Sequence, residues 1–232
     1  MGTRMARTAL SAARTAGPLR RAEGLAARVR LIHEASAEVV RVHGIEVHVH
    51  GQLPRGPSLY VANHVSWLDP VVLLGQAPAA AVAKADVARW PVVGGVCGAG
   101  GVLFLRRGDA FSGARVLRGM LRAFAAGVSV LNFPEGTTTE GGDVLEFHAG
   151  SFGAARLAGV PVIPIALRYR TPGMAWTGSA SFLPHYLRVA ARERCALDLR
   201  LCDAVQPDPS LSDREAARRA REAIRSALQE AF

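Results

Sequence analysis

Short apolar runs typical of β-strands alternate with amphipathic segments along most of the chain, and this alternation restricts the possible folds. Residues 58–64 (SLYVANH) and 128–134 (VSVLNFP) are apolar enough for buried strands, while 66–76 and 110–127 have the periodicity of helices. Helices between consecutive strands favour a parallel sheet, because each parallel connection must cross over a face of the sheet. We therefore predict an α/β fold with a single domain, in which a largely parallel mixed sheet of about seven strands has helices on both faces.

The remaining elements follow the same alternation. The sequence predicts further strands at 45–49, 80–85, 101–107, 160–169 and 195–205, and further helices at 31–42, 86–98 (broken), 149–158, 181–190 and 213–230. Gly127 is expected to end its helix, and Ser212 to cap the last one. A chain of 232 residues, 50% of them hydrophobic, can bury one sizeable core, which agrees with a single domain.

The first 30 residues differ from the rest because they are rich in arginine and alanine. We divide the chain into this basic N-terminal segment, residues 1–30, and a folded domain, residues 31–232. The segment lacks the apolar centre of a secretory signal, and two structures suit its composition: a flexible tail or a basic helix on a membrane surface. No run of about 18 apolar residues occurs, so no membrane-spanning helix is predicted.

The charge of the chain favours an anionic partner. The formal net charge is +9, and Lys84 is the only lysine, so almost all of the positive charge is arginine. An acidic lipid surface or a phosphorylated substrate fits this charge. Nucleic acid fits less well, because the arginines are scattered and no aromatic residues are interleaved with them. The three cysteines, an odd number without a paired motif, indicate a reducing, cytoplasmic setting.

The segment NHVSWLD, residues 63–69, follows a predicted strand and contains an imidazole and a carboxylate five residues apart. If the chain turns back at the start of the next helix, the Asp69 carboxylate reaches the His64 ring. It would then fix the tautomer and leave the other ring nitrogen free to act as a general base on an alcohol. A second interpretation is structural, because Ser66 and Asp69 have the spacing of a capping box. Spacing alone leaves both interpretations open.

The segment FPEGT, residues 133–137, presents a carboxylate, a flexible backbone and a hydroxyl after another predicted strand. Gly136 allows an anion to approach the main chain closely. On its own, this segment is also an ordinary turn. Other chemistries have less support, because the sequence has no GxSxG segment, and His48 and His50 have no further ligand placed to complete a metal site. We therefore predict no metal.

Four segments in this order, NHVSWLD, GVLFLRR, FPEGT and VPVIP, resemble the glycerophospholipid acyltransferase family, which includes 1-acylglycerol-3-phosphate acyltransferases. The resemblance covers about residues 45–170, and it depends mainly on the joint occurrence of the first and third segments. It implies that residues 31–232 form an acyltransferase domain.

The resemblance also implies roles for particular residues. His64 looks like the catalytic base of the family, and Asp69 like its orienting partner. The remaining implied residues bind the acceptor: Arg107, Glu135, Gly136 and Thr137. The planar fork of an arginine suits phosphate oxygens, so Arg107 is expected to meet the phosphate of the acceptor.

The implied reaction moves a fatty acyl group from acyl-CoA or acyl carrier protein to the hydroxyl of a lysophospholipid. The acceptor is expected to be 1-acylglycerol-3-phosphate, which gives phosphatidic acid. The thioester is a co-substrate and is already activated, so no cofactor is implied. The expected location is peripheral, at an anionic membrane surface on the cytoplasmic face of the cell membrane, with no nucleic acid as partner.

Three positions depart from the family pattern. Thr138 and Thr139 stand where many members have arginine and serine, and His148 stands where many have lysine. Two basic residues near a phosphate headgroup are therefore missing, and the stretches SWLD and ARWPVVG are similar to the branch that acylates lyso-ornithine lipids, which carry no phosphate. That acceptor is one alternative. A non-catalytic lipid-binding protein on the same scaffold and a thioester hydrolase are two others.

Overall fold

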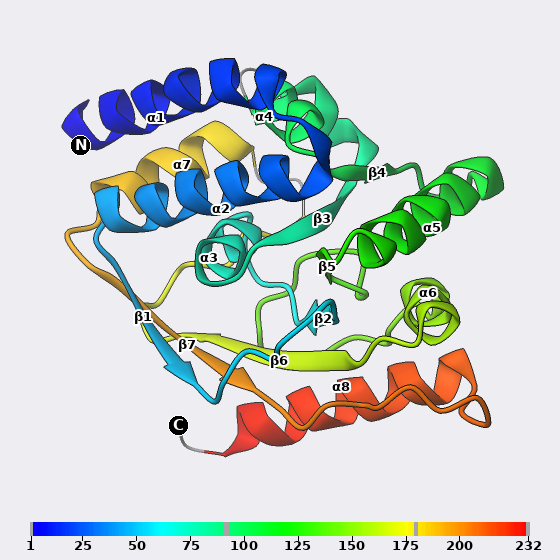
Figure 1. The fold of residues 1–232 in the computed structure, drawn as a ribbon. Helices are drawn as coiled ribbons and strands as arrows, with labels where there is room; N and C mark the ends of the chain where they lie inside the picture. The colour runs from blue at the N-terminus through cyan, green and yellow to red at the C-terminus, as the bar shows by residue number, and fades with distance from the viewer. Residues whose placement is uncertain (1, 91–92, 179–180, 231–232) are drawn as a thin grey trace.

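A mixed sheet of seven strands forms the centre of the molecule (Figure 1). The computed structural model describes residues 2–90, 93–178 and 181–230. In sequence order the strands are β1 (Ile45–His50), β2 (Leu59–Ala62), β3 (Ala79–Lys84), β4 (Leu103–Leu105), β5 (Ser129–Asn132), β6 (Val162–Tyr169) and β7 (Cys195–Leu201). Their order across the sheet is β1-β7-β6-β2-β5-β3-β4, and neighbours are parallel except for β6 and β7. The predicted fold class is confirmed.

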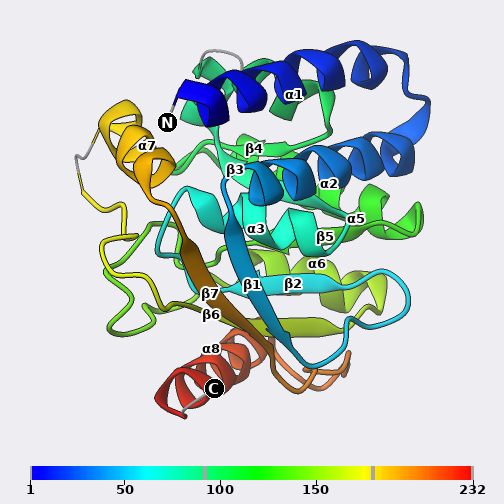
Figure 2. The same cartoon turned by 90° about the vertical axis from the view of Figure 1, so that its left-hand side faces the viewer.

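Helices cover both faces of this sheet (Figures 1 and 2). They are α1 (Gly2–Arg21), α2 (Gly24–Val42), α3 (Leu68–Gln76), the 3-10 helix η1 (Ala85–Arg89), α4 (Val93–Ala99), α5 (Ala110–Ala125), α6 (Gly150–Ala158), α7 (Phe182–Ala191) and α8 (Asp213–Gln229). Residues of α1, α2, α3 and α7 form one apolar core with the sheet. Residues of α5, α6 and α8 form a second core on the other side. Two layers of helices therefore sandwich the strands.

Local signals in the sequence place several helix ends correctly. Gly127 has a φ of 71° just after α5, a conformation that glycine adopts without strain. The Ser212 side chain accepts a hydrogen bond of 3.2 Å from the backbone N–H of Glu215 at the start of α8. The segment predicted as a broken helix at 86–98 contains most of η1 and the start of α4, and residues 91 and 92 between them lie outside the described residues. The helix predicted at 31–42 begins earlier, at Gly24, because Val29 extends its buried stripe by a turn.

The basic N-terminal segment is helical and packs on the domain. Leu19 of α1 is only 1% exposed, and α1 contacts α2 and α4. At the start of α1, the Arg4 guanidinium donates a hydrogen bond of 3.0 Å to the carbonyl of Glu193. Binding of this helix to a membrane surface stays a prediction, and the division of the chain at residue 30 falls within α2, which passes through that residue without a break. Over the residues that are described, no helix combines the length and apolarity needed to cross a bilayer.

Candidate active site

The candidate site lies at the edge of the sheet where the parallel strands end. Strand β2 lies between β5 and β6, and its register pairs Val61 with Asn132 and Ala62 with Ile165. The segments 63–69 and 133–137 therefore leave the sheet side by side. Loops at the carboxyl ends of parallel strands are the usual location of functional groups in such sheets.

Asn63 sets the direction in which the chain leaves β2. Its side-chain amide donates to the carbonyl of Leu167 at 2.9 Å and accepts from the backbone N–H of the same residue at 2.8 Å. Strand β2 ends at Ala62, so these two side-chain bonds take the place of backbone hydrogen bonds between β2 and β6. Asn63 is 2% exposed, so both of these hydrogen bonds are protected from water. Asn63 is not among the site residues predicted from the sequence, although this residue stands directly before His64.

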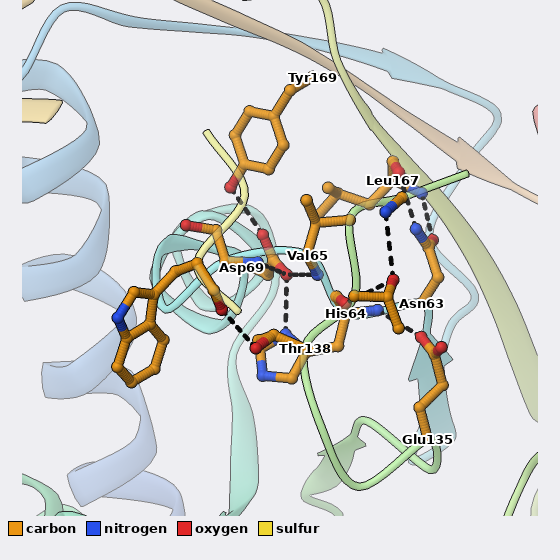
Figure 3. A network of polar contacts seen from close by, with 12 residues as sticks. Asn63, His64, Val65, Asp69, Glu135, Thr138, Leu167 and Tyr169 are labelled. Carbon is orange, nitrogen blue, oxygen red and sulfur yellow. Dashed lines mark hydrogen bonds and ion pairs between the residues drawn. The ribbon is translucent and has the colours of Figure 1, made fainter. Parts of the chain in front are cut away.

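The His64 ring is held by the Asp69 carboxylate (Figure 3). His64 Nδ1 lies 2.8 Å from Asp69 Oδ2, and the Asp69 side chain is fully buried while 18% of the His64 side chain is exposed. Phe133 stacks on the imidazole with 4.1 Å between ring centroids. With its proton on Nδ1, the ring keeps a lone pair on Nε2, which has no hydrogen-bond partner among the described residues.

Three further donors bind the Asp69 carboxylate. Oδ2 accepts the backbone N–H groups of Val65 at 2.7 Å and Ser66 at 2.8 Å, and Oδ1 accepts the hydroxyl of Tyr169 at 2.6 Å. Burial, followed by the charge of Asp69, raises the pKa of Tyr169 well above its usual value, so the phenol keeps the proton that it donates. Four donors fix the orientation of one carboxylate, and Tyr169 is a site residue that the sequence analysis missed.

The two interpretations of NHVSWLD are partly combined in the structure. Ser66 is not the N-cap expected for the helix, because α3 begins at Leu68 and Trp67 is its N-cap. Asp69 does bind the backbone N–H of Ser66, as a capping box requires of its acidic residue, and it binds His64 through the same oxygen. One carboxylate therefore closes the turn and orients the imidazole.

Glu135 supports the same turn from the neighbouring strand (Figure 3). Oε1 accepts the backbone N–H of His64 at 2.7 Å, and Oε2 accepts that of Leu145 at 2.9 Å. The side chain is 5% exposed, and burial raises the pKa of Glu135 in spite of these two bonds. Both oxygens bind the backbone, so Glu135 holds the turn in place, and its expected contact with the acceptor stays a prediction.

Gly136 lies between two exposed side chains, those of Arg107 and His148. It has a φ of 69°, and a Cβ placed on it would lie 3.3 Å from His148 Cδ2 and 3.6 Å from Arg107 Nη2. His148 is tied to the same segment, since its backbone N–H donates to the carbonyl of Pro134 at 2.9 Å. We call Arg107, Gly136 and His148 the cradle. Neither the Arg107 nor the His148 side chain forms a hydrogen bond or an ion pair with a described residue. Thr137, beside them, is also exposed.

Thr138 and Thr139, which stand where many family members have arginine and serine, form hydrogen bonds within the protein. The Thr138 hydroxyl donates to the carbonyl of Trp176, and the backbone N–H of Thr139 donates to the carbonyl of His64 at 2.8 Å. Their polar groups therefore hold loops together. Arg107 and His148 of the cradle are therefore the basic residues that remain exposed in this part of the site.

An aromatic cluster flanks the turn that carries His64, and it consists of Trp67, Trp90, Trp176, Phe182 and Tyr186. His185 of α7 connects it to the turn, because its Nδ1 accepts from Trp67 Nε1 at 2.9 Å and its Nε2 donates to the carbonyl of Ala175 at 2.9 Å. Burial lowers the pKa of His185, which favours this neutral form.

Two other features lie outside the site. A small apolar crevice is lined in part by α3, but none of the site residues lines it. In the part of the chain that the structure describes, no three His, Cys, Asp or Glu side chains come close enough together to hold a metal ion.

A buried carboxylate, an imidazole with one unpaired nitrogen and an exposed arginine lie together at the ends of parallel strands. This arrangement defines a class of α/β protein whose site is suited to general-base chemistry. Comparison with known proteins narrows this class. A family model described as "Acyltransferase" matches residues 40–168, which is more than half of the chain, and the chain belongs to this acyltransferase family.

The chain is similar to several characterised members. It is 36% identical to a lyso-ornithine lipid O-acyltransferase of Pseudomonas aeruginosa, over 87% of this chain and 79% of that protein. It is 32% identical to a 1-acyl-sn-glycerol-3-phosphate acyltransferase of Neisseria meningitidis, over 70% of this chain and 63% of that protein. The crystal structure of a 1-acyl-sn-glycerophosphate acyltransferase from Thermotoga maritima matches the fold with a TM-score of 0.65, at 23% identity, over 88% and 80% of the two chains. The suspected family resemblance is confirmed.

Proposed function

We propose that the protein is an O-acyltransferase that moves a fatty acyl group from a thioester carrier to the hydroxyl of a lyso-ornithine lipid. The observation that carries the proposal is the contact between His64 Nδ1 and the buried Asp69 carboxylate, which leaves Nε2 as the base. Three relatives named as lyso-ornithine lipid O-acyltransferases, between 30% and 36% identical to this chain, support this acceptor.

In the proposed mechanism, His64 Nε2 takes the proton of the acceptor hydroxyl as the oxygen attacks the thioester carbonyl. A C–O bond forms, the C–S bond breaks, and the carrier leaves as a thiolate that recovers the proton from the imidazolium. Asp69 stabilises the imidazolium through Nδ1, and such general-base assistance accelerates reactions by about 10²–10⁴-fold. No acyl-enzyme is required, because the thioester is already activated. The proposed mechanism also requires no metal and no organic cofactor.

In this proposal the cradle binds the anionic group of the acceptor. Arg107 offers its planar fork, and Gly136, which has no Cβ, keeps that side of the backbone free of a side chain. In a lyso-ornithine lipid the anion is a carboxylate. The second candidate acceptor is 1-acylglycerol-3-phosphate, favoured by the fit of Arg107 to a phosphate and by the relative from Neisseria meningitidis.

The proposal also covers the donor and the location. Acyl-CoA and acyl carrier protein are both suitable donors for a protein with a net charge of +9. We further propose peripheral attachment to the cytoplasmic face of the membrane through α1, which carries arginines in its last turn and no acidic residue in its first. Reduced binding to anionic vesicles after deletion of α1 would support this attachment, and unchanged binding would contradict it.

A His64→Ala variant tests the proposed activity. Acyl transfer to lyso-ornithine lipid and to lysophosphatidic acid is measured in parallel, with acyl-CoA and with acyl carrier protein. His64→Ala should lose about 10³-fold in kcat while its unfolding temperature stays unchanged. His48→Ala, which alters an exposed histidine on β1, serves as the control. Retained transfer would exclude His64 as the base, and thioester cleavage without any acceptor would instead support a hydrolase. No activity in the wild type would support a lipid-binding protein.

A further inference from the structure

Helix α5 presents a stripe of exposed residues beside the site. Phe111, Arg115, Arg118 and Arg122 follow one another at intervals of four, three and four residues, so they lie on one face of the helix. All four are exposed, and Phe111 is 85% exposed, more than the other exposed large hydrophobic side chains of the described chain. We call these four residues the α5 stripe.

The arginines of the stripe have no acidic partners. None of the three side chains makes an ion pair or a hydrogen bond with a described residue, and α5 itself contains no Asp or Glu. Another arginine-rich helix, α8, is different. Its Arg218 and Arg219 pair with Glu215 at 2.6 and 2.9 Å. Like charges three and four residues apart repel each other on a helix, so the stripe favours an acidic group that comes from outside.

The stripe begins at the site. Helix α5 starts three residues after Arg107 of the cradle, and Phe111 lies in its first turn. The opposite face of α5 is already buried, with Val116, Met120 and Phe124 in the core. A helix that lies in a lipid surface needs a broad apolar face, and α5 has only Phe111 to offer. A folded acidic partner therefore fits the stripe better than a bilayer does.

We propose that the α5 stripe is the docking surface for an acidic acyl carrier protein, which delivers its thioester to His64. This inference rests on the proposed function, and it adds that the acyl donor is acyl carrier protein, bound at the α5 stripe. The arginines would bind carboxylates of the carrier, and Phe111 would occupy a small apolar depression on it. Complementary charge of this kind raises the rate of association and makes that rate sensitive to salt.

The double variant Arg115→Glu/Arg118→Glu tests the docking surface. Rates are measured with acyl carrier protein and with acyl-CoA carrying the same acyl chain, and with the acceptor in neutral detergent micelles. The KM for acyl carrier protein should rise about tenfold or more, while kcat and the KM for acyl-CoA stay within about twofold. The wild-type kcat/KM for acyl carrier protein should fall as salt is added, and the variant should lose most of this dependence.

The matched control is Arg194→Glu/Arg214→Glu, which changes the net charge equally at two exposed arginines outside α5. This control should leave kcat and KM unchanged with both acyl carrier protein and acyl-CoA. Equal losses with both donors, or an unchanged KM for acyl carrier protein, would overturn the docking surface. So would a loss that appears only on anionic vesicles, since that would assign the stripe to the membrane. Wild-type activity with acyl-CoA alone would overturn it too, and would leave the proposed acyl transfer standing.

Discussion

The turn that holds His64 and the cradle beside it lie next to each other, but they differ in how far their polar groups are bonded inside the protein. In the turn, Asp69 accepts four hydrogen bonds and Glu135 accepts two, and both carboxylates are buried. In the cradle, the side chains of Arg107 and His148 are exposed and bond no described residue. The polar groups of the turn are bonded within the protein, whereas the side chains of the cradle are exposed and lack partners among the described residues.

This difference has a physical consequence. Groups that are bonded and buried before substrate arrives need not reorganise during the reaction, which is the condition for effective general-base catalysis. Groups that stay in water lose hydration only when a matching anion replaces it, so they contribute to the choice of substrate. Substitutions in the turn should therefore act mainly on kcat, and substitutions in the cradle mainly on the preference among acceptors.

Asp69→Asn should have the largest effect. The amide removes the charge that stabilises the imidazolium and disturbs the tautomer of His64, so kcat should fall about 10³-fold or more. The KM for the acceptor should change by less than about threefold, because the cradle is intact. Steady-state kinetics measures both values. A loss below about tenfold would show that the bonded turn does not set the rate.

Glu135→Gln should have the second largest effect. A glutamine oxygen can accept only one of the two backbone N–H groups, and the amide N–H₂ would face the other. We expect a loss of about 1–3 kcal/mol in the free energy of unfolding and a fall in kcat of about tenfold or more. Glu146→Gln, an exposed glutamate near the same segment, is the control. Equal stability of the two variants would contradict the role of Glu135.

The wild type and the Glu135→Gln variant should also differ in how their stability depends on pH. Burial raises the pKa of Glu135 in the folded protein, so ionising it costs more in the folded state than in the unfolded one. The stability that the wild type has relative to Glu135→Gln should therefore be greatest below about pH 4.5 and should decline as the pH rises through the raised pKa. Chemical denaturation of both proteins from pH 4 to 7 measures this. A difference that grows with pH would have the wrong sign.

Tyr169→Phe should have a moderate effect. It deletes one of the four donors to Asp69, and about tenfold in kcat corresponds to one hydrogen bond to a charged group. In an Asp69→Asn background the same substitution should cause little further loss, because the two residues act as a unit. Tyr60→Phe, a buried tyrosine of β2, is the control. Losses that add in the double variant would mean that Tyr169 acts elsewhere.

These residues also show what the sequence can and cannot predict. His64 and Asp69 were found because their contact is local, set by a strand end and the first turn of a helix. Tyr169 lies 100 residues from Asp69 and meets it only because β6 runs beside β2 and extends beyond it. The same register brings Leu167 to Asn63. The alternation of strands and helices predicted the sheet, but not the order of its strands, on which these long-range contacts depend.

His148→Lys should have the smallest effect on kcat but should change the preference for the acceptor. Beside Arg107, a histidine adds one hydrogen-bond donor, whereas a lysine adds a permanent charge. A phosphate carries more negative charge than a carboxylate, so it gains more from the second cation. We expect kcat/KM for lysophosphatidic acid, relative to lyso-ornithine lipid, to rise about fivefold, roughly 1 kcal/mol. His48→Lys on β1 should leave the ratio unchanged. If His148→Lys also leaves it unchanged, the open cradle does not choose the acceptor, and the contrast with the bonded turn would concern catalysis alone.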